Sequence, residues 1–152
     1  MMKPGLEFVF ELNGALEPSV SVGQTPHGLR RVVPIKRGQF AGPEIRGTIV
    51  PGGADWQLVR SDGVNELEAL YLLRTDDGVT IQVRNRGLRH GPEAVMKRLF
   101  AGEPVDPAEY YFRAVPAFAA PAGKYEWLNR SIFLCAGARQ GESIRLWMYR
   151  VT

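Results

Sequence analysis

The fold is decided by residues 51–87, which read PGGADWQLVRSDGVNELEALYLLRTDDGVTIQVRNRG. Two turn signals, each ending in Asp-Gly, separate segments in which apolar and polar residues alternate, a pattern typical of antiparallel hairpins. Asp62-Gly63 is interpreted as a two-residue turn. Asp76-Asp77-Gly78 is interpreted as a three-residue loop with Gly78 in the left-handed conformation. The stretch therefore predicts three consecutive antiparallel strands.

The two turns set the strand register and so decide which side chains share a face. The first turn places Trp56 opposite Ala69, and the second loop places Ala69 opposite Asn85. The face expected to point toward the core carries Trp56, Leu58, Leu67, Ala69, Tyr71, Leu73, Ile81, Val83 and Asn85. The face expected to point to solvent carries Asp55, Gln57, Glu66, Glu68, Arg74, Thr80, Gln82, Arg84 and Arg86, interrupted by Val59, Leu70 and Leu72. A buried amide at Asn85 would need hydrogen-bond partners.

The composition is that of one ordinary globular domain, residues 1–152, with 45% hydrophobic and 23% charged residues. The net charge of +3 is weak and the arginines are spread along the chain, so no nucleic-acid partner is expected. The single cysteine, Cys135, cannot form an internal disulfide, which favours a cytoplasmic location. The N-terminal residues do not have the pattern of a secretion signal, and no apolar run reaches membrane-spanning length, so no membrane partner is expected.

The rest of the chain is dominated by strand patterns. Strands are predicted at residues 6–12, 17–24, 28–35, 44–50, 109–119, 125–137 and 143–151, a loop at 36–43, a corner at 51–53, and one short helix within 90–107. Nine or ten antiparallel strands predict a small all-β barrel, because closure removes exposed sheet edges. A β-sandwich is the alternative.

Four segments carry a family resemblance: FAGPEIRGTIVPGGADWQLVRSDG at 40–63, LLRTDDGVTIQVRNRG at 72–87, YFRAVPAF at 111–118 and KYEWLNRSIF at 124–133. With them the chain, over about residues 8–151, resembles the bacterial and fungal proteins of domain-of-unknown-function family 3237. The resemblance implies a lipocalin-like antiparallel barrel of one domain and no settled activity. In the family pattern an arginine precedes the tyrosine at Tyr71, whereas Leu70 stands here, a departure that bears on the ligand.

The pattern of histidine and cysteine predicts no metal site. His27 and His90 lie in separate loops, and the sequence has no His-x-His or Cys-x-x-Cys spacing. Cys135 lies in an apolar run, which favours a small buried hydrophobic residue over a nucleophile paired with a histidine. No phosphate loop follows the glycines at 52 and 53, so no nucleotide or metal cofactor is expected.

Asp55 and Tyr71 are the candidates for a proton carrier. Asp55 follows a glycine corner at the start of a strand, where it would be either a general base or ligand anchor, or a cap of the backbone.

Alternation puts Tyr125, Trp127 and Asn129 on one face, as in a ligand pocket or in an ordinary aromatic core. Arg113 could bind an anionic ligand or pair with an external carboxylate.

Three functions follow as hypotheses. The first is a small-molecule-binding barrel whose pocket is lined by Trp56, Tyr71, Asn85, Arg113, Tyr125, Trp127 and Asn129. The second is a metal-independent lyase, isomerase or hydrolase in the same pocket, with Asp55 or Tyr71 carrying a proton and Asn85 or Asn129 as oxyanion donor. The third is a structural or interaction protein with a filled core, and a homodimer is compatible with all three.

Overall fold

The computed structural model describes the whole chain, Met1–Thr152, which forms nine strands, one α-helix and two short 3-10 helices. The strands are β1 (Leu6–Leu16), β2 (Val20–Thr25), β3 (Gly28–Ala41), β4 (Arg46–Val59), β5 (Asn65–Thr75), β6 (Thr80–His90), β7 (Tyr111–Ala119), β8 (Phe133–Gln140) and β9 (Ser143–Val151). The helices are α1 (Glu93–Phe100), η1 (Pro107–Glu109) and η2 (Glu126–Arg130). None of the helices has the length and apolar character needed to cross a membrane.

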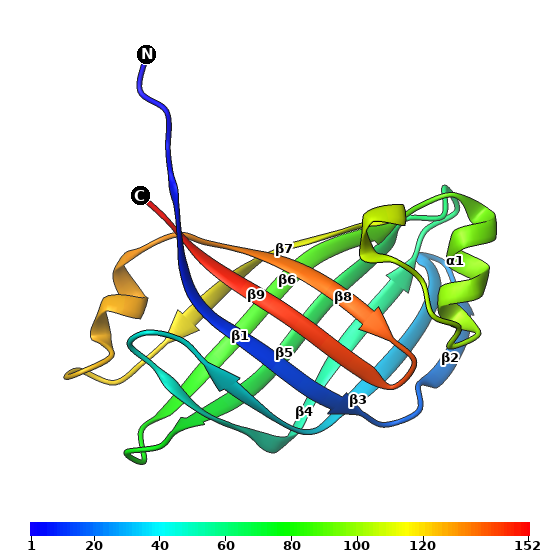
Figure 1. The fold of residues 1–152 in the computed structure, drawn as a ribbon. Coiled ribbons are helices and arrows are strands. Elements are labelled where there is room, and N and C mark those ends of the chain that lie inside the picture. Colours follow the sequence, from blue (N-terminus) through cyan, green and yellow to red (C-terminus); the bar gives the residue numbers. More distant parts are fainter.

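The strands form one antiparallel sheet in the order β1-β9-β8-β7-β6-β5-β4-β3-β2, and an additional pairing between β1 and β3 closes it. Eight strands therefore make a closed barrel, and β2 is an extra strand on β3 (Figure 1). β1 and β2 lie end to end along β3, since Leu16 pairs with Ile35 and Val20 pairs with Val32. This confirms the predicted barrel rather than the sandwich.

The inward-facing side chains of the barrel form one apolar cluster. Phe10, Leu73, Ile81, Val83 and Met148 are fully buried. Removing this apolar area from water is the main free-energy term that favours the closed form. The inward face predicted for β5 and β6 is confirmed.

The two ends of the barrel are covered differently. Figure 1 shows α1 beside β2 at one end and η2 at the opposite end. α1 buries Met96 and Leu99, and Glu93 and Lys97 form an exposed ion pair one turn apart. Pro92 precedes its first residue, and Gly102, with φ of 78°, follows its last turn. The predicted helix is therefore present, in a shorter form.

Three predicted boundaries are wrong. Residues 36–41 continue β3 instead of forming a loop, because they pair with β1. The corner at 51–53 is an irregularity inside β4, with Gly52 at a φ of 111°. The segment 125–137 is not a continuous strand, since Glu126–Arg130 form η2 and β8 begins at Phe133.

The register of the second hairpin is confirmed and that of the first is wrong by one residue. Ala69 pairs with Asn85 as predicted, but Trp56 pairs with Glu68 instead of Ala69. The amide N–H of Arg60 donates to the carbonyl of Val64, so the first loop has three residues, as the second does. A slip of one residue turns every side chain of a strand to the other face. Asp55 and Gln57 therefore point inward, and Trp56 and Leu58 point outward.

Replacement of Gly78 by valine tests the second loop. Gly78 has a φ of 89°, and a Cβ at this position would meet no atom within 4 Å, so the cost comes from the backbone alone. We expect Gly78→Val to lower the free energy of unfolding, measured with a denaturant, by about 1–3 kcal/mol. Thr80→Val, at an exposed strand position nearby, serves as control and should change it by less than about 0.5 kcal/mol. Equal stability of both variants would contradict the left-handed loop.

Candidate functional site

The barrel lumen contains a small cavity where three neighbouring strands bring Asp55, Ala69 and Asn85 side by side. Asp55 pairs with Ala69 across β4 and β5, and Ala69 pairs with Asn85 across β5 and β6. The short side chain of Ala69 leaves room between the two polar ones. The cavity has a volume of about 50 Å³ and is lined by Leu12, Leu16, Ile35, Ile49, Asp55, Leu67, Ala69, Tyr71, Asn85, Phe112, Ala114, Ile144 and Leu146.

Three polar oxygen atoms in this apolar cavity have no hydrogen-bond partner in the protein. They are Oδ1 of Asp55, the hydroxyl of Tyr71 and Oδ1 of Asn85, all enclosed. Each buried polar group without a partner costs about 1–3 kcal/mol of stability. Natural proteins keep few such groups, and the three here lie in one cavity. All three oxygens are therefore free to form a hydrogen bond inside the cavity.

Burial changes the acidity of the two candidate proton carriers. The pKa of Asp55 is raised because its carboxyl is desolvated, although the amide of Gln57 donates to Oδ2 at 2.8 Å and opposes that shift. The pKa of Tyr71 is raised well above its usual range, because burial and the charges of Cys135 and Asp55 disfavour the phenolate. Tyr71 is thus a neutral hydrogen-bond donor or acceptor, and Asp55 is a carboxyl that holds its proton more tightly than an exposed aspartate.

A polar layer lies one step closer to α1 than the cavity. Gln57 is two residues from Asp55 on the inner face of β4, and its Oε1 accepts from Nε of Arg31 at 2.7 Å. The Asn65 amide, oriented with its oxygen toward the guanidiniums, accepts from Nη2 of Arg31 at 3.2 Å and of Arg89 at 3.1 Å. Hydrogen bonds and charge thus connect the arginines at this end of the barrel to Asp55.

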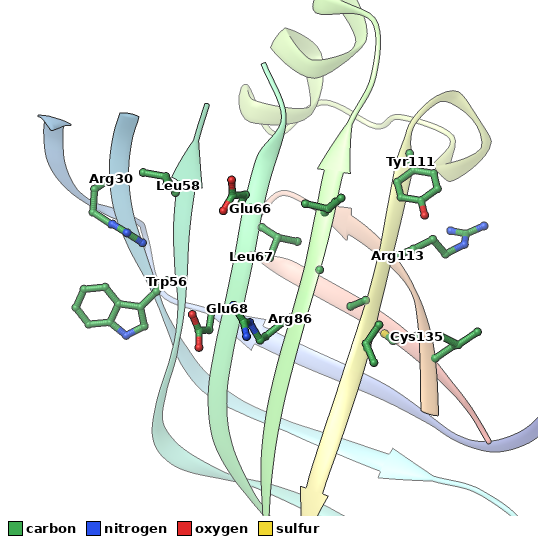
Figure 2. Close-up of a pocket in the computed structure, with 15 residues that line it drawn as sticks. Arg30, Trp56, Leu58, Glu66, Leu67, Glu68, Arg86, Tyr111, Arg113 and Cys135 are labelled. Atoms are coloured by element: carbon green, nitrogen blue, oxygen red, sulfur yellow. The ribbon is translucent and has the colours of Figure 1, made fainter. Parts of the chain in front are cut away.

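The structure places Asp55, Tyr71 and Asn85 in the lumen and places two other predicted site residues outside it. Trp56 is 49% exposed on the outer face because of the register of β4. Arg113 is exposed on β7, where its Nη1 donates to the carbonyl of Phe112 at 2.9 Å. Figure 2 shows both around a groove on the outer surface, together with Glu68 and Arg86.

The remaining predicted site residues lie at the η2 end, so the expected convergence in the lumen does not occur. The hydroxyl of Tyr125 donates to Oδ1 of Asp77 at 2.7 Å. The Asn129 amide accepts from the N–H of Ala120 and donates to its carbonyl, both at 2.8 Å. Trp127 packs near Phe133, and these contacts hold the loop that precedes β8.

Cys135 and the histidines do not form a nucleophilic pair. Burial raises the pKa of the Cys135 thiol to about 12, so the thiolate is scarce at neutral pH. His90 is on the surface, where it stacks on Tyr111 at 4.9 Å. No group of three or more His, Cys, Asp or Glu side chains lies close enough together to hold a metal ion.

Sequence reasoning missed five polar residues of the lumen: Arg31, Gln57, Asn65, Arg89 and Arg139. The alternation of Ile81, Val83 and Asn85 along β6 continues to Arg89, so the confirmed register of that hairpin could have placed it inside. Gln57 could have been found by giving both loops the same length.

A family model described as "Protein of unknown function (DUF3237)" matches residues 4–151. A "UPF0311 protein" of Rhodopseudomonas palustris is 38% identical over 152 residues, 99% of each chain. The crystal structure of a conserved protein of unknown function from the same species covers both chains completely, with a TM-score of 0.97 and 35% identity. A "beta-barrel like protein" from Acinetobacter baumannii has a TM-score of 0.87 and 34% identity, over 100% of this chain and 98% of that one.

One more distant relative is named for an activity. A Penicillium herquei protein named "Hydroalkoxylation enzyme phnH" is 32% identical over 80 residues, 53% of each chain. The crystal structure of an enzyme from the same fungus has a TM-score of 0.72 at 22% identity, which shows a shared fold only.

Replacement of Asp55 by asparagine tests the buried carboxyl. Because its folded pKa is raised, the protonated form is favoured in the native state, and stability is lost as pH rises through that pKa. We expect Asp55→Asn to be more stable than the wild type at about pH 8, with the advantage shrinking toward about pH 4, in denaturant titrations at each pH.

Asp62→Asn is the matched control, for which we expect the opposite change in stability at neutral pH. Hydrogen bonds from the Arg60 side chain and the Val64 backbone lower the pKa of exposed Asp62 to about 2. Ionised Asp62 therefore stabilises the native state above its unfolded pKa, and this stabilisation is lost as pH falls. The asparagine variant should be the less stable protein at neutral pH. The same pH trend in both variants would contradict the assignment of Asp55.

Proposed function

The chain belongs to the DUF3237 family, and we propose that its barrel lumen binds a small, mainly apolar molecule to or from which Asp55 transfers a proton. One observation carries this proposal: the enclosed oxygens of Asp55, Tyr71 and Asn85, which lack protein partners, all border a cavity whose other walls are apolar. Ligand sites commonly combine apolar walls with a few polar groups that orient the ligand. In a filled, purely structural core, these unpaired oxygens would lower the stability of the fold and serve no purpose.

Each of the three residues has a distinct role in the proposed site. Asn85 orients the ligand by accepting a hydrogen bond at Oδ1. Tyr71, uncharged at neutral pH, donates to or accepts from the polar group of the ligand through its hydroxyl. Asp55 exchanges a proton with the ligand, because a carboxyl with a raised pKa is a better acid than a fully ionised one at neutral pH.

Catalysis, rather than binding alone, is favoured by the acidity of Asp55 and by the fungal relative. The name of that relative describes a hydroalkoxylation, in which an O–H bond adds across a carbon–carbon double bond. One carboxyl can serve both halves of such a step: it gives its proton to the alkene carbon, and its carboxylate then takes the proton that the oxygen loses. For this chain we propose the same class of proton transfer, that of a lyase or isomerase. Cys135 has no part in this step, because burial raises the pKa of its thiol to about 12.

The outer groove in Figure 2 does not enter the proposed function. Its apolar side chains include Trp56, Leu88 and Val115, each at least 40% exposed. A homodimer stays a prediction.

The lumen site is tested by filling it. Native mass spectrometry of the purified protein, followed by extraction, should identify a retained small molecule. We expect its loss in Ala69→Val, which adds two methyl groups to the cavity, and in Asn85→Leu, which removes the orienting amide. Leu72→Ala, on the outer face of the same strand as Ala69, is the control and should retain the molecule. Both cavity variants should keep a melting temperature close to that of the wild type, and retention in both would contradict the lumen site.

Proton transfer is tested with the retained molecule in D2O. The wild type should introduce deuterium at carbon, detected as a mass increase of the extracted molecule. Asp55→Asn should bind the molecule without this exchange, since the amide cannot exchange protons as an acid. Asp62→Asn, on the surface, should behave as the wild type. Undiminished exchange in Asp55→Asn would contradict the assigned role, and the binding function would stand alone.

A further inference from the structure

Three arginines meet at the α1 end of the barrel. β1 ends at Leu16 and β2 begins at Val20, and a short turn connects them. A cavity of about 320 Å³ lies beside this turn, and its walls include Arg31 of β3, Arg89 of β6, Arg139 of β8 and Phe100 of α1. It is distinct from the cavity that holds Asn85, because the arginines lie one layer closer to the end of the barrel.

None of these three guanidiniums has a carboxylate partner within 4.0 Å, although exposed arginines elsewhere in the chain do. Arg89 is only 1% exposed, and its Nε is enclosed without a hydrogen-bond partner. Arginines are almost never buried without a counter-charge, because desolvation of a charge is costly. The arrangement is thus incomplete without an anion.

The groups that do contact the arginines are neutral. Gln57 and Asn65 offer amide oxygens, and the rings of Phe100 and Phe112 lie under the guanidiniums, Arg31 being 4.2 Å from the Phe100 centroid and Arg89 5.4 Å from that of Phe112. Burial and repulsion from Arg139 lower the pKa of Arg89 to about 10, so its guanidinium remains charged at neutral pH. Aromatic and amide contacts stabilise a cation only partly.

We propose that Arg31, Arg89 and Arg139 bind the carboxylate of an organic acid whose apolar part reaches toward the lumen.

The charge balance favours an anion. Asp55 and Glu142 are the carboxyl groups whose charges act on this cluster, and Glu142 is exposed at the rim. Because burial raises the pKa of Asp55, its carboxyl offsets the three arginines only in part, and the cluster keeps an excess of positive charge. Arginine also suits a carboxylate because the guanidinium can donate two parallel hydrogen bonds to it.

The position of the cluster links it to the proposed lumen site. Asp55 and Gln57 are two residues apart on one face of β4, a separation of about 7 Å. The side chain of Gln57 lies between the two, since its Oε1 accepts from Nε of Arg31 and its Nε2 donates to Oδ2 of Asp55. A carboxylate held by the arginines would thus lie one layer away from the carboxyl of Asp55. This inference rests on the proposed function, since it specifies the class of molecule that the lumen receives.

The test compares two probes of equal length that differ in charge, butyrate and butyramide. Isothermal titration calorimetry is performed in a buffer without phosphate or other carboxylates. We expect the wild type to bind butyrate at least about tenfold more tightly than butyramide, as charge-assisted hydrogen bonds to buried arginine would give. Equal affinities, or no butyrate binding at about 10 mM, would overturn the anion site.

Single-residue variants test whether these arginines are the ones that bind butyrate. Arg89→Met keeps an apolar stem of similar length and should lower the butyrate affinity about tenfold while leaving butyramide unchanged. Arg139→Gln, at a half-buried position, should act in the same direction and serves if Arg89→Met does not fold. Arg84→Met, on the outer face of the same strand as Arg89, is the control and should change neither probe. Unchanged butyrate binding in both cluster variants would overturn the proposal.

Two further measurements distinguish the carboxylate site from the proposed lumen function and from a phosphate site. Ala69→Val should weaken both probes alike. If it weakens neither while the arginine variants act on butyrate, the lumen function fails and the anion site stands. Inorganic phosphate is titrated in parallel, and tighter binding of phosphate than of butyrate would overturn the assignment to a carboxylate.

Discussion

Pairing between β1 and β3 is the constraint on which the rest of the structure depends. β1 lies between β9 on one side and β3 on the other, so it joins the two ends of the sheet. Closure pairs the backbone groups that an open sheet would leave at its edges, and it removes the inner face from water. Every property of the lumen follows from that exclusion: the apolar packing, the shifted acidity of Asp55 and the cost of an unpartnered oxygen.

The closed lumen is not uniform along its axis. At the η2 end it is filled with fully buried apolar side chains such as Leu73, Ile81 and Met148. Toward α1 it contains Asp55, Gln57 and Arg89, groups that lower stability unless they are paired. A local loss of stability of this kind is expected where a protein binds or transforms another molecule. The densely packed apolar end offsets the stability that is lost at the polar end.

A single residue in one loop decides which side chains the lumen receives. Ser61-Asp62-Gly63 and Asp76-Asp77-Gly78 form loops of the same length, with Gly63 and Gly78 at φ of 87° and 89°. In both, the third residue takes the left-handed conformation and the preceding residues make the turn. A two-residue first turn would point Trp56 into the barrel and Asp55 into water, and it would leave no carboxyl in the cavity. The chemistry of the lumen thus depends on backbone geometry about seven residues away from Asp55.

The sequence by itself determined most of the strands, the closed antiparallel architecture and the inner face of the second hairpin, because alternation and the loop at Asp76-Asp77-Gly78 are local signals. It also singled out Tyr71 and Asn85, because the other residues on the same face of these strands are apolar. Only the tertiary structure decided that Asp55 faces inward, that Asn129 ties the loop before β8 to Ala120, and that Arg31, Arg89 and Arg139 from three distant strands meet at one end. The reason is physical: local periodicity specifies faces within a strand, whereas the grouping of charges depends on how the closed sheet stacks its layers, which no single segment encodes.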